Sequence, residues 1–156
     1  MKKNYIVLPI FNDWKSLEKV LIILNKSFKN TKSSNHVVIV NDCSFNNLQK
    51  NKYKNFDNFK SLKLINLKKN VGSQKAIFFG LKYLQKKITK KTDQIIISIL
   101  DSDGEDNPKK LKELIHLANQ KKDYVIFASR KERTESIFFR LLNYFRLFIT
   151  FILTGK

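Results

Sequence analysis

Residues 95–106 read Ile-Ile-Ile-Ser-Ile-Leu-Asp-Ser-Asp-Gly-Glu-Asp, and this stretch decides the fold class of the chain. Its continuous apolar run predicts a strand buried on both faces, as in a parallel sheet that is covered by helices. The run ends in a cluster of carboxylates, Asp101, Asp103, Glu105 and Asp106. Because like charges this close repel one another, the cluster requires a compensating cation. Oxygen ligands at the end of a rigid strand suit a hard divalent metal, Mg2+ or Mn2+, that keeps positions open for phosphates.

The end of this cluster has a second interpretation as the start of a helix. Asp106 or Asn107 can act as the N-cap, with Pro108 in the first helical turn. This interpretation accounts for Asp106 and Asn107 but not for Asp101 and Asp103. The sequence therefore predicts metal or phosphate chemistry at the two aspartates that follow the strand.

Strand-like and helix-like segments alternate along the whole chain. Strands are predicted at residues 5–10, 36–40, 62–67, 95–100 and 124–128, and helices at residues 14–24, 70–87 and 108–120. Residues 62–67 alternate between apolar and polar, as an exposed or edge strand does, and Asp13 is placed as the N-cap of the first helix. This alternation predicts an α/β fold with a mostly parallel sheet and helices on both faces. Ligands of such sheets bind beyond the carboxyl ends of the strands. Polar residues follow those ends at positions 9–13, 41–44, 70–73, 101–105 and 129–133, so we expect them to converge on one edge.

Length and composition restrict the class of protein. A chain of 156 residues can form one domain with a hydrophobic core. The single cysteine, Cys43, excludes an internal disulfide framework and fits a reducing compartment. We expect neither a secretory signal nor a clean transmembrane span.

The net charge of +18 comes mostly from lysines that are scattered along the chain. Such a bias is what an AT-rich coding sequence produces. The lysines lack interleaved aromatic side chains and the sheet edge is acidic, so we expect no nucleic-acid partner.

The arginines are distributed differently from the lysines. All four lie between positions 130 and 146, namely Arg130, Arg133, Arg140 and Arg146. Guanidinium groups bind phosphate with two parallel hydrogen bonds, which an ammonium group cannot reproduce. The cluster therefore favours phosphate binding over ordinary surface charge.

Residues 136–153 are almost entirely apolar or aromatic. Their polar exceptions, Arg140, Asn143, Arg146 and Thr150, recur every three or four residues and form one narrow stripe on a helix. Two arginines make a spanning helix unfavourable. The pattern favours an amphipathic helix in the membrane interface, and the alternative is a core helix that packs on further protein. We therefore divide the chain at 1–134 and 135–156.

Five motifs occur in a fixed order, and they are Leu8-Pro-Ile-Phe-Asn-Asp13, Val40-Asn-Asp-Cys-Ser44, Asn70-Val-Gly72, Asp101-Ser-Asp-Gly-Glu-Asp-Asn-Pro108 and Ser129-Arg-x-x-Arg133. Together they resemble the family 2 glycosyltransferases, which have the GT-A fold. Within that family the chain looks most similar to the branch that transfers a sugar to polyprenyl phosphate, the dolichyl-phosphate mannose synthase type. Asn41 stands where the family usually has Asp, and Cys43 stands where it has Gly.

The resemblance implies roles for particular residues. The donor, a UDP- or GDP-linked sugar, would be bound by Pro9, Phe11, Asp13, Asp42, Lys75 and Asp101. The metal ligands would be Asp101, Asp103 and Glu105, and the catalytic residues would be Asp103, Arg130 and Arg133. The two arginines would hold the acceptor phosphate or the donor diphosphate.

The resemblance also implies an inverting, metal-assisted displacement at the cytoplasmic side of the membrane, by a peripheral protein. A lipid phosphate is already anionic, so no side-chain general base is required. The family normally continues beyond a segment like Leu153-Thr-Gly-Lys156. The alternative is therefore a non-catalytic remnant or split subunit that binds nucleotide sugar or membrane and requires a partner chain or a second copy.

Overall fold

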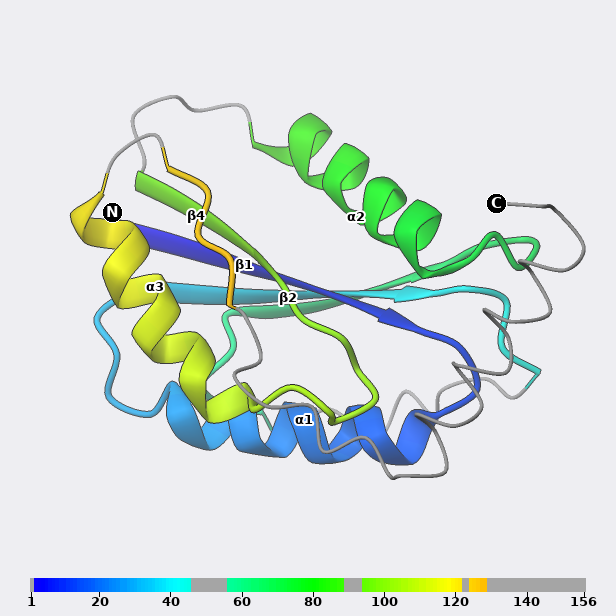
Figure 1. Ribbon diagram of the computed structural model, residues 1–156, viewed down its shortest axis with the longest axis horizontal. Coiled ribbons are helices and arrows are strands. Elements are labelled where there is room, and N and C mark those ends of the chain that lie inside the picture. Colours follow the sequence, from blue (N-terminus) through cyan, green and yellow to red (C-terminus); the bar gives the residue numbers. More distant parts are fainter. Residues whose placement is uncertain (1, 46–55, 89–93, 122–123, 129–156) are drawn as a thin grey trace, which may run out of the picture. The chain divides into compact units, whose positions relative to one another are not determined.

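The computed structural model describes residues 2–45, 56–88, 94–121 and 124–128. Its elements, in chain order, are β1 (Lys2–Ile10), α1 (Trp14–Ser27), β2 (Ser34–Asn41), β3 (Ser61–Asn66), α2 (Ser73–Lys87), β4 (Gln94–Ile99), the short 3-10 helix η2 (Pro108–Lys110) and α3 (Leu111–Gln120). Figure 1 shows how these elements are arranged. Except at residues 124–128, the predicted order of strands and helices is confirmed.

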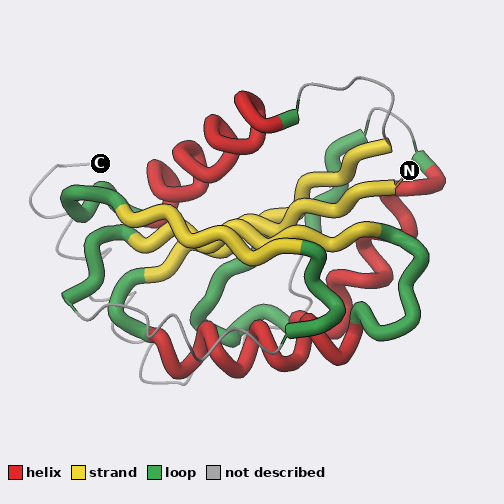
Figure 2. Tube along the Cα trace, turned by 180° about the vertical axis from the view of Figure 1, so that it is seen from behind, coloured by secondary structure: helices red, strands yellow, loops and turns green. Residues whose placement is uncertain are grey.

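In the described part of the chain, the strands form one parallel sheet in the order β3-β2-β1-β4. The register places Ile10 opposite Asn41, Asn41 opposite Asn66, and Val7 opposite Ile99. Helices cover both faces, with α2 on one side and α1 on the other (Figure 2). The predicted α/β fold with a parallel sheet between helices is therefore confirmed, and β3 lies at an edge as its alternating sequence indicated.

One face of the sheet packs against α1 and α3. Alternate residues of β1 point to this face, where they meet the apolar sides of the two helices in a core of Ile6, Leu8, Ile10, Leu17, Val20, Leu21, Leu24, Leu111 and Ile115. Helix α1 begins where the side chain of Asp13 accepts a hydrogen bond from the Ser16 amide at 3.1 Å, which confirms Asp13 as the N-cap.

The opposite face packs against α2 through Tyr5, Val7, Val38, Val40, Ala76 and Leu84. Small residues on the helix allow this contact to be close. A Cβ atom at Gly80 would lie 2.7 Å from a methyl carbon of Val7 and 3.1 Å from one of Val40. Glycine at this position therefore determines how near α2, and the loop before it, can approach the sheet.

The prediction that residues 95–100 form a strand buried on both faces is wrong in one respect. Among the described strands β4 lies at an edge of the sheet, and Ile97 and Ile99 are 43% and 49% exposed. Their register partners Tyr5 and Val7 face α2, but this helix packs on β1 and β2. An apolar run cannot reveal whether a helix reaches far enough to cover it.

The predicted strand at residues 124–128 is also wrong, because the structure assigns no strand there. A short run such as Tyr-Val-Ile-Phe-Ala has high strand propensity, but propensity becomes a strand only where a neighbour completes the hydrogen-bond ladder. In the described residues β4 pairs only with β1.

The chain divides into two compact units, Met1–Ile126 and Phe127–Lys156. The predicted interface helix and the predicted boundary at residue 134 lie outside the described residues, as do Arg130 and Arg133. Within the described residues, no helix is long and apolar enough to cross a membrane.

Candidate functional site

The carboxyl ends of β1, β2 and β4 lie at one edge of the sheet, and α2 begins at the same edge (Figure 1). Because β1 lies between β2 and β4, the loops that follow these three strands are neighbours. The predicted donor-binding residues within the described chain all lie at this edge, and they are Pro9, Phe11, Asp13, Asp42, Lys75 and Asp101. The expected convergence is therefore present for the segments at 9–13, 41–44, 70–73 and 101–105, whereas residues 129–133 lie outside the described residues.

Pro9 lies in a central strand, where a residue without an amide hydrogen normally interrupts the ladder. The Val7 carbonyl accepts a hydrogen bond from the Leu100 amide at 3.1 Å, so the backbone polar groups of Val7 point toward β4. Pro9 is two residues further on and faces the same side, where β4 has already ended. There the buried Ser102 hydroxyl donates to the Pro9 carbonyl at 2.5 Å. The missing amide hydrogen of Pro9 therefore removes no hydrogen bond between β1 and β4. The Pro9 carbonyl instead anchors residues 101–106, which we call the acidic loop.

The Ser102 anchor orients the two aspartates that flank it. Ser102 is buried, whereas Asp101 and Asp103 are exposed. Asp103 Oδ1 accepts the Glu105 amide at 2.9 Å, and Gly104 between them has a φ of 82°. A turn that needs positive φ is most easily made by glycine. The loop thus presents two carboxylates on its outer side.

The donor chemistry of these carboxylates fits Mg2+ or Mn2+, which prefer oxygen ligands. Among the described residues, no three His, Cys, Asp or Glu side chains are grouped closely enough to hold a metal ion. Asp101 and Asp103 could therefore supply two ligands, with donor phosphates and water as the others. A third ligand from Glu105 stays a prediction.

Asp42 joins β2 to the start of α2. It is only 3% exposed, and its two carboxylate oxygens accept the amides of Val71 and Gly72 at 2.8 Å each. Gly72 has a φ of 86° and precedes the first residue of α2. Asp42 therefore positions the Asn70–Gly72 motif, a role that the sequence did not reveal. Its predicted contact with the nucleoside stays a prediction.

The loops after β1 and β2 are joined by two reciprocal hydrogen bonds. The Asn12 amide donates to Ser44 Oγ at 2.8 Å, and the Phe45 amide donates to Asn12 Oδ1 at 2.9 Å. Asn12 has a φ of 63°, and the Asp13 amide donates back to the Phe11 carbonyl at 2.8 Å, so Asn12 is the centre of a tight turn. Asparagine tolerates this left-handed conformation better than most residues do.

Asn41, which replaces the family's usual carboxylate, makes two different hydrogen bonds. Its Oδ1 accepts the Ser44 amide at 2.9 Å, and its Nδ2 donates to Asn66 Oδ1 at 3.0 Å. A carboxylate can accept but cannot donate, so aspartate could make only the first bond. The replacement is therefore matched by Asn66 on the neighbouring strand.

Asp13 and Lys75 are exposed residues at the starts of α1 and α2. Hydrogen bonds from Ser16 to the Asp13 carboxylate lower the pKa of Asp13 below its usual value, and Lys19 and Lys15 lower it further. Asp13 is therefore a stable anion, held by its own helix. Its predicted role in donor binding and that of Lys75 stay predictions.

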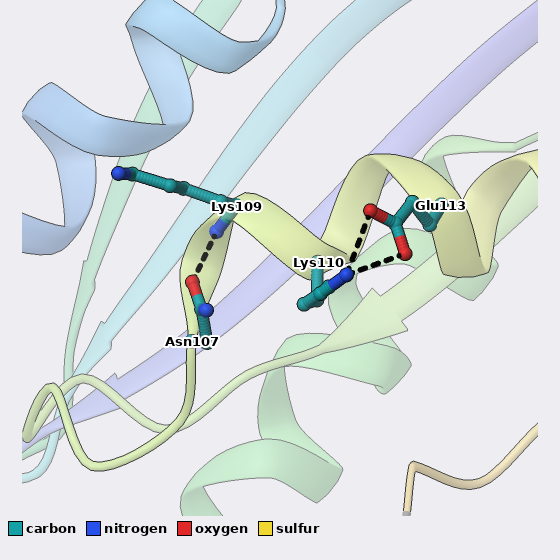
Figure 3. Close-up of polar contacts among 4 residues, drawn as sticks. All are labelled: Asn107, Lys109, Lys110 and Glu113. Atoms are coloured by element: carbon teal, nitrogen blue, oxygen red, sulfur yellow. Dashed lines mark hydrogen bonds and ion pairs between the residues drawn. The ribbon is translucent and has the colours of Figure 1, made fainter.

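The acidic loop ends at the first turn of η2, as Figure 3 shows. Asn107 Oδ1 accepts the Lys109 amide at 3.1 Å, which confirms Asn107 as a cap, and Pro108 follows it. Lys110 Nζ lies 3.0 Å from both carboxylate oxygens of Glu113. The second interpretation of the acidic cluster therefore holds at Asn107, and it does not account for Asp101 and Asp103.

Sequence reasoning missed the residues that hold the loops in place, namely Asn12, Ser44 and Ser102, and it missed the exposed ring of Phe45. The available signal was weak. A small polar residue between two aspartates and an asparagine after an aromatic residue are both common in loops, and their partners are distant in sequence.

The fold defines a class of α/β proteins with a parallel sheet, and ligands of such sheets commonly bind beyond the carboxyl ends of the strands. The model of glycosyl transferase family 2 matches residues 5–154. The chain belongs to this family, and its GT-A type fold is the one predicted from the motifs.

A curated relative agrees with this assignment, and solved structures share the fold. An uncharacterised glycosyltransferase from Synechocystis sp. is 27% identical over 128 residues, which are 82% of this chain and 37% of the relative. The crystal structure of S. aureus TarS is similar with a TM-score of 0.55 and 24% identity, over 77% of this chain and 20% of TarS. S. aureus TarS 1–349 in complex with UDP-GlcNAc is similar with a TM-score of 0.51 and 21% identity, over 85% of this chain and 39% of that one. The chain thus spans well under half the length of these proteins.

Proposed function

We propose that this chain binds a nucleotide-diphosphate sugar at the carboxyl edge of its sheet and transfers the sugar to polyprenyl phosphate. The observation that carries the proposal is the set of hydrogen bonds by which Ser102, Asp42 and Asn12 position the loops of three motifs at one edge. The complex of a structural neighbour, S. aureus TarS 1–349, with UDP-GlcNAc supports a UDP-linked donor. A GDP-linked donor remains the second candidate from the resemblance.

The two exposed aspartates bind the donor diphosphate through a divalent cation in this proposal. Both aspartates are exposed, and the buried Ser102 between them holds the loop to the Pro9 carbonyl. A bound Mg2+ or Mn2+ neutralises the charge that develops on the departing nucleoside diphosphate. Ser102 and Gly104 keep the two carboxylates in place without contacting the donor themselves.

The reaction is a single displacement. An oxygen of the acceptor phosphate forms a bond to the anomeric carbon, while the bond from that carbon to the donor diphosphate breaks. The electron pair leaves with the nucleoside diphosphate, and the configuration at the anomeric carbon inverts. Arg130 and Arg133 lie outside the described residues, and we assign them to phosphate binding from their sequence alone.

The apolar segment 136–153 supports an acceptor in the membrane, because its arginine stripe suits an interface position at the cytoplasmic side. Deletion of residues 136–156 is expected to release the protein from vesicles that contain anionic lipid. Sedimentation of protein with vesicles measures this binding. Persistent binding of the shortened protein at high salt would exclude the segment as the anchor.

Titration calorimetry with UDP- and GDP-sugars, with and without Mn2+, tests donor binding. We expect metal-dependent binding in the wild type and its loss in Asp103→Asn. Glu113→Gln is the matched control, because Glu113 is an exposed carboxylate that pairs with Lys110 on another element. No binding of any donor would contradict the proposal. Binding without turnover of added polyprenyl phosphate would favour the non-catalytic alternative, in which a partner chain or a second copy is required.

A further inference from the structure

We infer that Phe45, together with Phe11, forms the surface on which the planar base of the donor nucleotide stacks. The inference rests on the proposed function, because it assigns the base-binding part of the same site. Phe11 was expected to line the nucleotide pocket, whereas none of the sequence motifs or family matches assigns a role to Phe45.

The two rings come from neighbouring loops and lie against each other. Phe11 follows β1 and Phe45 follows the Asn41–Ser44 motif, yet their ring centroids are 6.2 Å apart with planes tilted by 53°. Phe11 is 45% exposed and Phe45 is 88% exposed. A phenylalanine ring has no polar group to satisfy in water, so exposing a pair of them at the ligand-binding edge is unfavourable unless a ligand covers them.

The position of Phe45 is set by its backbone rather than by packing of its ring. The Phe45 amide donates a hydrogen bond to Asn12 Oδ1. The hydroxyl of the preceding Ser44 accepts a hydrogen bond from the Asn12 amide, and the Ser44 amide donates one to Asn41 Oδ1. Both Asn12 and Cys43 have positive φ values, of 63° and 61°. Such backbone is uncommon outside glycine, and it persists where surrounding bonds hold it. The hydrogen bonds therefore fix the backbone from which the exposed ring projects, and the ring itself lies against Phe11.

A nucleotide matches the arrangement of this edge. Its base is planar and apolar on its faces, and its diphosphate is anionic and binds metal. The ring pair begins directly after β1, and the Pro9 carbonyl of the same strand anchors the loop that carries Asp101 and Asp103. One end of the edge thus suits a base and the other suits a diphosphate. Because every base has a π-face, we expect the rings to bind uracil and guanine alike.

The test uses the full chain, with UDP, GDP and inorganic pyrophosphate as probes in the presence of Mn2+. Phe45→Ala is expected to weaken UDP and GDP binding by about tenfold, which is typical for the loss of one aromatic stacking partner. Pyrophosphate binding should not change, because pyrophosphate has no base. Phe45→Tyr keeps an aromatic face and should bind both nucleotides as the wild type does.

A second pair of variants tests the hydrogen bonds that hold the ring. Asn12→Gly accepts a positive φ but removes the acceptor for the Phe45 amide, so nucleotide binding should weaken while pyrophosphate binding stays the same. Asn12→Asp keeps that acceptor and should retain nucleotide binding. Phe78→Ala is the matched control, since Phe78 is 59% exposed on α2 and belongs to no part of the site.

The outcomes separate the inference from the proposed function. If the wild type binds UDP or GDP and Phe45→Ala binds them equally well, the stacking surface is excluded and the proposed function stands. If Phe45→Ala weakens pyrophosphate binding as much as nucleotide binding, the effect is not on the base, and the inference also fails. If the wild type binds neither nucleotide, the proposed function fails and the inference fails with it.

Discussion

The two ends of the same sheet use polar side chains in different ways. At the amino end, buried side chains bond mostly to one another: Asn4 donates to Asn35 at 2.8 Å, and Asn35 donates to Thr31 at 2.9 Å. His36 stacks on Tyr5 with ring centroids 4.8 Å apart. At the carboxyl end, Asp42 and Asn12 bond to the backbone of a neighbouring loop, and Ser102 bonds to the backbone of β1.

Backbone conformation differs between the two ends as well. Five described residues have positive φ values, and Asn12, Cys43, Gly72 and Gly104 belong to the loops of the carboxyl end. Glycine adopts this backbone without strain, whereas at Asn12 and Cys43 it is uncommon and persists where surrounding bonds hold it. The amino end thus bonds its polar side chains within the fold, whereas the carboxyl end fixes the loops at which we propose that the ligand binds.

The largest effect is expected from Asp103→Asn at the carboxyl end. The variant keeps the oxygen that accepts the Glu105 amide, so the fold should persist, but it loses the charge that binds a metal. Metal-dependent donor affinity should fall at least about a hundredfold, beyond the usual effect of changing an outer-sphere residue. Calorimetry measures the affinity, and the thermal midpoint checks the fold. Equal affinities would remove Asp103 from the site.

Gly80→Ala should have the second largest effect, because it separates α2 from the sheet. The added methyl would lie 2.7 Å from a carbon of Val7, and overpacking of this kind costs about 1–3 kcal/mol. Denaturant unfolding measures the loss. Lys82→Ala on the exposed side of the same helix should change stability by less than about 0.5 kcal/mol. If Gly80→Ala left the free energy of unfolding unchanged, α2 could move away from the sheet without loss of stability.

Asp42→Asn sharpens the comparison, because it replaces one oxygen of a buried carboxylate whose two oxygens each accept a hydrogen bond from a backbone amide. The new amide group would face the hydrogen of either Val71 or Gly72, leaving a buried donor unpaired at a cost of about 1–3 kcal/mol. We expect weaker donor binding in addition, since the Asn70–Gly72 loop loses its anchor. Asp57→Asn at an exposed position is the control for unfolding. Unchanged stability and binding would deny Asp42 its positioning role.

The smallest effect concerns the amino end and depends on pH. Burial lowers the pKa of His36 below 6.5, and the charges of Lys87, Lys3 and Lys60 lower it further. Protonation therefore favours the unfolded chain: the contribution to stability is complete above pH 6.5 and is lost as the pH falls through the folded-state pKa. His36→Gln should lack this decline in unfolding measurements, whereas His116→Gln should keep it. Donor binding should not follow the same titration if the two ends are independent.

The sequence predicted the fold well because its signals are local. The apolar run at 95–100, the cap at Asp13 and the break at Pro108 each act within a few residues of themselves. Residues 97 and 99 show the limit. Isoleucine at either position predicts a strand, but its exposure depends on how far α2 extends over the sheet, and α2 lies elsewhere in the chain.

The charged residues of the candidate site could be predicted from the sequence, whereas the residues that hold its loops in place could not. Asp101 and Asp103 stood out because carboxylates are scarce in this basic chain. Ser102 did not, because its partner, the Pro9 carbonyl, is 93 residues away. Phe45 did not stand out in the sequence either, because the Asn12 side chain that accepts its amide hydrogen bond is 33 residues away.

The sequence by itself determined the parallel α/β class, the order of its strands and helices, and the chemistry available at the carboxyl ends of the strands. These follow from hydrophobic periodicity, capping and the spacing of polar motifs, which are properties of neighbouring residues. Only the tertiary structure decided that Asp42 holds Val71 and Gly72, and that Asn12 joins the loops after β1 and β2. The physical reason is that a hydrogen bond between distant segments depends on strand order and register, which bring those segments together only after the chain has folded.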